Sequence, residues 1–130
     1  MRLSESVFFS LFGVIFGAVF TGFGINCFVR PDHALSFFYF EDLRVPGDQQ
    51  LVDYLMIVYG ARDIFMGVAL WITLYFGSRK ALGGTMIACG AIAIVDGVVC
   101  KMHGFGEWDH WGYSPMLVIT GLVTMGVLDW

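Results

Sequence analysis

Three charged side chains interrupt the apolar stretches of this sequence. Arg62 and Asp63 lie inside the stretch 54–76, and Asp96 lies inside the stretch 81–99. A charge near the bilayer centre costs about 2.5–3.5 kcal/mol on insertion scales, so such charges usually face a bundle interior and mark functional sites. Two carboxylates and a guanidinium suit the acid–base opening of an epoxide, in which one carboxylate activates water and the other donates a proton. We therefore predict that Asp63, Asp96 and Arg62 are catalytic.

The division of roles between the two carboxylates stays open at this stage. In one assignment Asp63, next to Arg62 and deeper in the membrane, is the base, while Asp96, nearer the bundle mouth, is the acid; the reverse is equally consistent with the sequence. Neighbouring helical residues project about 100° apart, so Arg62 is expected to reach across the bundle to Asp96. As an alternative without chemistry, the three residues form a buried ion-pair network that only fixes helix register.

Further polar and aromatic side chains gather in the same half of the expected bundle. The histidines flank the ends of the apolar stretches, and Tyr59 shares a helix face with Arg62 by the i, i+3 rule. The predicted substrate-binding residues are Asn26, Tyr59, His33, His103, His110 and Trp111. The spacing of His103, Glu107, Asp109 and His110 differs from that of known zinc motifs, so neither a metal nor another cofactor is predicted.

Composition decides the class of protein. Of the 130 residues, 58% are hydrophobic and only 14% are charged, which is more apolar than a soluble domain of this size can bury. Four apolar segments have lengths near those needed to cross a bilayer, about 30 Å of hydrocarbon. The sequence predicts an all-α, integral membrane four-helix bundle, a single domain over 1–130 with helices at about 8–29, 54–76, 81–99 and 113–128.

Several simpler features limit the other interpretations. Arg2 before an apolar run also fits a signal peptide, but the run is longer and more aromatic than usual and has no clear cleavage site. Lys and Arg are split evenly between the two sides, so orientation is not settled, and no nucleic-acid motif is present. Gly13 and Gly17 form a small-residue step that serves either internal packing or self-association. The apolar segment 34–40 is expected to cover the bundle mouth as a lid.

Short motifs connect the chain to a known kind of protein. Tyr59 to Asp63, Asp96-Gly97, Asn26, Arg30-Pro31 and His110 to Gly112 resemble a family of small four-helix membrane proteins of unknown function, common in filamentous fungi and similar in layout to DoxX-like proteins. Some members resemble the membrane hydrolases of aurovertin- and citreoviridin-type polyketide pathways. That resemblance implies the opening of epoxides into cyclic ethers.

The expected function is therefore a membrane-embedded hydrolase or cyclase that opens epoxides of a lipophilic, polyketide-like substrate. The expected partners are that substrate and the lipid bilayer, with a homo-oligomer possible and no nucleic acid. The resemblance implies a multi-pass protein of the endoplasmic reticulum if the source is eukaryotic. Two competing functions are a small proton-coupled transporter of lipophilic compounds and a non-catalytic membrane scaffold. The cation beside the acid argues against proton exchange, because it holds the acid ionised.

Overall fold

The computed structural model describes residues 2–129, with only the backbone described at residue 41, and this part of the chain is helical without strands. Three helices are long and apolar enough to cross a membrane, so the chain is compatible with an integral membrane protein. These are α1 (Val7–Val29), α3 (Gln49–Phe76) and α4 (Arg79–His103). The shorter helices are α2 (Pro31–Leu35), α5 (Trp108–Trp111) and α6 (Ser114–Thr124), with 3-10 turns at Leu3–Glu5, Ser36–Phe38 and Glu41–Leu43.

The fourth predicted membrane helix, 113–128, differs most from expectation. The chain turns back after α4, forms α5 and then the 11-residue helix α6, so the fourth rod is broken into two pieces. Pro115, in the first turn of α6, has no N–H to continue the hydrogen-bond ladder from α5. With the short helices included, the described bundle has more than the four helices predicted, and α6 alone is too short to cross a bilayer.

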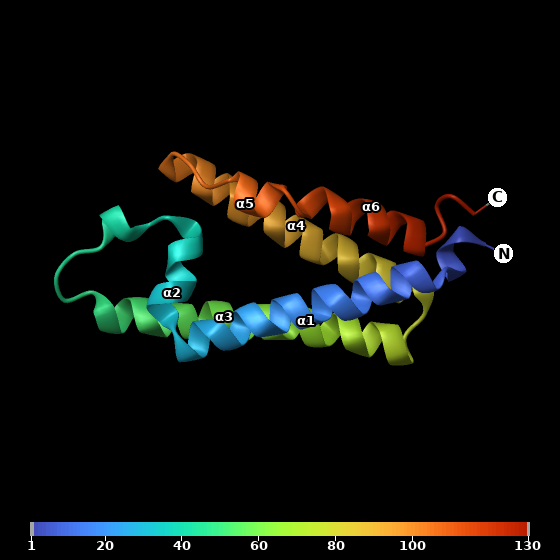
Figure 1. Ribbon diagram of the computed structural model, residues 1–130, viewed down its shortest axis with the longest axis horizontal. Coiled ribbons are helices and arrows are strands. Elements are labelled where there is room, and N and C mark those ends of the chain that lie inside the picture. The colour runs from blue at the N-terminus through green and yellow to red at the C-terminus, as the bar shows by residue number, and fades with distance from the viewer. Residues whose placement is uncertain (1, 130) are drawn as a thin grey trace.

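Four of the helices pack as two antiparallel pairs, α1 with α3 and α4 with α6, as Figure 1 shows. Both termini and the α3–α4 turn lie at one end of the bundle, and α2 lies toward the other (Figure 1). Glycine permits the close contact within the first pair: a Cβ on Gly60 would lie 2.7 Å from the Gly24 carbonyl oxygen. The buried Gly17 packs under Trp71, so the Gly13/Gly17 step packs within the chain.

Local sequence signals fix the helix ends. The Ser6 hydroxyl accepts a hydrogen bond from the Phe8 N–H at the start of α1, and the Ser78 hydroxyl accepts one from the Ala81 N–H at the start of α4. Pro31 occupies the first turn of α2, directly after α1 ends. The predicted end of the first helix, at about residue 29, is therefore confirmed, and the chain turns at Pro31 to cover the bundle mouth.

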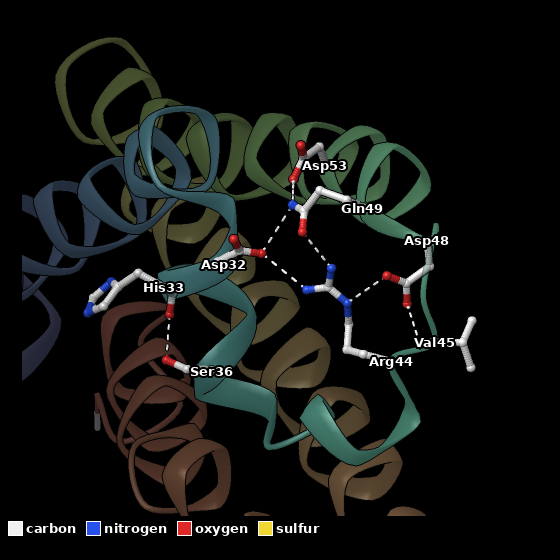
Figure 2. A network of polar contacts seen from close by, with 8 residues as sticks. All are labelled: Asp32, His33, Ser36, Arg44, Val45, Asp48, Gln49 and Asp53. Atoms are coloured by element: carbon white, nitrogen blue, oxygen red, sulfur yellow. Dashed lines mark hydrogen bonds and ion pairs between the residues drawn. The ribbon is translucent and has the colours of Figure 1, made fainter.

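A polar network holds the covering segment, residues 31–48, to the start of α3. Figure 2 shows the Arg44 guanidinium between its three acceptors: Nη1 donates to Asp32 (3.1 Å), Nε to Asp48 (2.9 Å) and Nη2 to Gln49 (2.6 Å). The Val45 N–H also donates to Asp48. This backbone hydrogen bond and, less strongly, Arg44 lower the pKa of Asp48, so its carboxylate stays ionised at and below the usual Asp pKa.

Arg44→Ala is expected to loosen this segment without unfolding the bundle. Arg44 joins α2, the connecting loop and α3, but exposed ion pairs add little to global stability. Amide hydrogen exchange of residues 32–48 is expected to accelerate several-fold while the exchange of α4 stays unchanged. Arg30→Ala is the matched control, because Arg30 makes its side-chain hydrogen bond only to Asn26 within the described contacts. Equal acceleration in both variants would contradict the role given to Arg44.

Candidate functional site

The three charges of the apolar helices meet between α3 and α4. Arg62 extends from α3 to α4, where Nη1 donates to Asp96 Oδ1 (3.1 Å) and Nη2 donates to Asp96 Oδ2 (2.9 Å). Nη2 also contacts Asp63 Oδ1 at 3.4 Å, a longer and weaker hydrogen bond. The planar guanidinium thus binds one carboxylate through both oxygens and touches the second with the same nitrogen.

The surroundings of this ion cluster are largely closed to solvent. Asp63 is 4% exposed and Asp96 is 9% exposed, whereas about a third of the Arg62 side chain is exposed. The Tyr59 ring lies against the guanidinium, with Arg62 Cζ 4.2 Å from the ring centroid, a distance typical of a cation–π contact. Arg62 Nε is buried and has no hydrogen-bond partner within the described residues. The cluster is therefore held by one cation, two anions and one aromatic face.

Both carboxylates line a cavity of about 80 Å³ between the helices and the covering segment. Its wall is mostly apolar and aromatic, with few polar groups, as is typical of a site for a small organic ligand. The lining residues are Phe20, Phe23, Cys27, Ala34, Phe37, Phe38, Tyr59, Asp63, Met66, Ala93, Asp96, Asp109, His110 and Tyr113. Among the predicted site residues, Tyr59, Asp63, Asp96 and His110 lie in this wall.

The three histidines have different environments. His110 is 6% exposed, stacks on Phe38 with a centroid distance of 5.0 Å, and faces the cavity. His33 instead hydrogen-bonds Asn26 (Nδ1 to Nδ2, 3.0 Å), and His103 pairs with Asp42 (Nε2 to Oδ1, 2.7 Å). Neither pair is part of the described cavity wall. The structure therefore places Asn26, His33 and His103 outside the cavity wall, in pairs at the bundle mouth.

Trp111 is not among the residues that line the cavity. Its Nε1 donates to the Ile94 carbonyl oxygen (3.1 Å), and a Cβ on Gly97 would lie 2.1 Å from the same nitrogen. The indole thus occupies the space above Gly97, next to Asp96, and fixes α5 against α4. Trp111 does not line the cavity as predicted for a substrate contact; it determines how α5 lies on the bundle.

Several cavity residues were not identified from the sequence. They include Phe20 and Met66 from the helices, Phe38 from the covering segment, Asp109 from α5 and Tyr113 at the start of α6. The i, i+3 spacing of His110 and Tyr113 is a signal that was available. Hydropathy does not reveal this face, because the predicted fourth helix begins only at residue 113, after His110.

The fold and the site define a class of protein: a small helical protein that has three helices of membrane-spanning length and an apolar cavity lined by two buried carboxylates. Comparison with family models then matches residues 17–124 to DUF4267, a domain of unknown function. Since the match covers most of the chain, the protein belongs to this family. Searches among curated proteins and among solved structures found no match.

Proposed function

We propose that this protein is a membrane-embedded hydrolase or cyclase that opens epoxides of a lipophilic substrate. The observation that carries the proposal is that Arg62 joins two carboxylates from different helices, and both carboxylates line one apolar cavity. A buried ion pair that only fixed helix register would need no adjoining cavity. The predicted resemblance to fungal polyketide hydrolases agrees with this chemistry.

The two carboxylates take different roles in the proposed reaction. Asp96 receives two charge-assisted hydrogen bonds from Arg62, which fix the position of its carboxylate, and we assign it the role of general base. Asp63 makes a single, longer contact of 3.4 Å with Arg62, so we assign it the role of general acid. This is the reverse of the first assignment considered from the sequence.

The reaction needs only the substrate and water. Asp96 takes a proton from water while the water oxygen forms a bond to an epoxide carbon, and the C–O bond at that carbon breaks. The epoxide oxygen takes the proton of Asp63, giving a diol. The proton on Asp96 then returns to Asp63, directly or through solvent, which restores the starting state. When a hydroxyl of the substrate replaces water, the same proton transfers give a cyclic ether.

The cavity supports a substrate that is lipophilic around its reacting group. Pockets that enclose a drug-sized ligand have volumes of about 300–1,000 Å³, so a cavity of about 80 Å³ fits the reacting portion of a substrate and the few atoms beside it. We infer that the rest of the substrate lies between the helices or in the bilayer. We also propose that the chain crosses the membrane several times, with α5 and α6 together forming the fourth crossing. If the source is eukaryotic, the proposed location is the endoplasmic reticulum.

Oxygen-18 water tests the proposed reaction directly. Membranes containing the wild type, Asp63→Asn, Asp96→Asn or Arg62→Gln are incubated with a polyene that carries one epoxide and one free hydroxyl, and the products are read by mass spectrometry. A labelled diol in the wild type alone indicates hydrolysis, and an unlabelled cyclic ether indicates internal cyclisation. Unchanged epoxide in every sample would refute epoxide opening for this substrate and would favour transport.

A further inference from the structure

His110 lies in the cavity wall but has no role in the proposed reaction. Both nitrogens of its ring are buried. Only 6% of the surface of His110 is exposed, so the residue is almost fully buried. Neither Nδ1 nor Nε2 meets the distance and angle of a hydrogen bond with any described residue, although the Phe37 backbone lies nearby. A buried polar atom without a partner is costly, and native structures usually satisfy it with a ligand or an ordered water.

The position of His110 is fixed from three sides. Its ring stacks on Phe38 of the covering segment at an interplanar angle of 24°, and the Tyr113 ring lies 6.5 Å away. On the next residue, Trp111 anchors α5 to α4 through the Ile94 carbonyl. The imidazole is therefore held in the cavity wall near Asp96 and is not free to turn outward to solvent.

The imidazole is suited to a neutral hydrogen-bonding role. Both ring nitrogens are closed off from solvent, and burial disfavours the charged form of an imidazole. A neutral imidazole offers one N–H donor and one acceptor nitrogen. A hydroxyl can use either nitrogen, whereas a carbonyl uses only the donor.

We propose that His110 binds a second polar group of the substrate, a hydroxyl or a carbonyl. The substrate class is then a lipophilic chain that carries this group as well as the epoxide. This inference rests on the proposed function for the epoxide, but the contact at His110 is a binding interaction and does not depend on turnover. Apolar residues of the same cavity wall, including Phe20 and Met66, would contact the chain that joins the two polar groups.

A matched pair of probes tests this contact. The full chain is reconstituted in lipid nanodiscs with Asp63→Asn, so that any turnover is slowed, and dissociation constants are measured for 5,6-epoxyhexan-1-ol and 1,2-epoxyhexane. We expect the hydroxyl to improve affinity about tenfold, the effect of one hydrogen bond to a previously unsatisfied group. Adding His110→Phe is expected to remove this ratio while preserving the ring stack on Phe38. Comparing ratios between variants cancels the different partitioning of the probes into lipid.

Two further variants and a spectrum complete the test. His110→Gln keeps a donor and an acceptor and is expected to retain part of the ratio, whereas His103→Phe, which removes an imidazole paired with Asp42, is expected to leave it unchanged. Nitrogen-15 signals of His110 are expected to move with the hydroxyl probe and not with the epoxyhexane. A ratio unaffected by His110→Phe, unmoved signals, or no binding of either probe would overturn the inference. A lost ratio combined with no epoxide turnover in the wild type would support His110 as a ligand contact and refute the proposed reaction.

Discussion

Asp96→Asn is expected to lower the rate of epoxide opening by about 10²- to 10⁴-fold, the range of a lost general base. The substitution keeps the shape of the side chain, but the amide cannot accept a proton from water, and it offers Arg62 one acceptor oxygen where the carboxylate offered two. The rate is measured on reconstituted protein from the loss of epoxide and the appearance of diol or cyclic ether.

Chemical rescue separates the two carboxylate roles. Azide attacks an epoxide without needing to lose a proton, so added azide is expected to restore opening in Asp96→Asn as an azido alcohol. It is not expected to restore Asp63→Asn, which lacks the proton donor. Asp53→Asn is the control for the loss of a carboxylate from α3. Asp53 lies near the start of this helix, where its carboxylate accepts a hydrogen bond from Gln49. Rescue of Asp63→Asn alone would reverse the assigned roles, and wild-type rates in both variants would refute them.

Arg62→Gln is expected to lower the free energy of unfolding by about 3–5 kcal/mol, because removing one partner of a buried ion pair leaves the other charge uncompensated. Here two carboxylates would share one neutral amide, and both are almost fully buried. The exposed third of the Arg62 side chain admits some solvent, so the lower end of this range is expected. Unfolding is followed by circular dichroism in mixed micelles with increasing dodecyl sulfate.

The triple variant Arg62→Gln, Asp63→Asn, Asp96→Asn provides the decisive comparison. It removes all three charges and is expected to recover most of the stability lost in Arg62→Gln, since neutral amides carry a smaller desolvation penalty. Arg79→Gln is the control: Arg79 donates to the Glu5 carbonyl oxygen at the opposite end of the bundle, and a change within about 0.5 kcal/mol is expected there. If Arg62→Gln unfolds like the wild type, the charges are not coupled in the way their distances indicate.

The sequence by itself determined the class of protein and the principal charged residues. Hydropathy adds up over neighbouring residues, so the spans that became α1, α3 and α4 were visible without any knowledge of packing. The end of α1 before Pro31 follows from the missing N–H of proline. Arg62, Asp63 and Asp96 stood out because charges are rare in apolar stretches, and the need for each to find a partner predicted their meeting.

The tertiary structure decided the parts of the site that lie outside regular membrane helices. His33, His103 and His110 occupy similar places in the sequence pattern, yet only His110 lies in the cavity wall of the described structure. What separates them is non-local: Trp111 packs on Gly97, which brings α5 against α4, while Asn26 and Asp42 hold the other two imidazoles at the mouth. The depth of such a residue depends on contacts between distant segments, which local hydropathy and spacing do not encode.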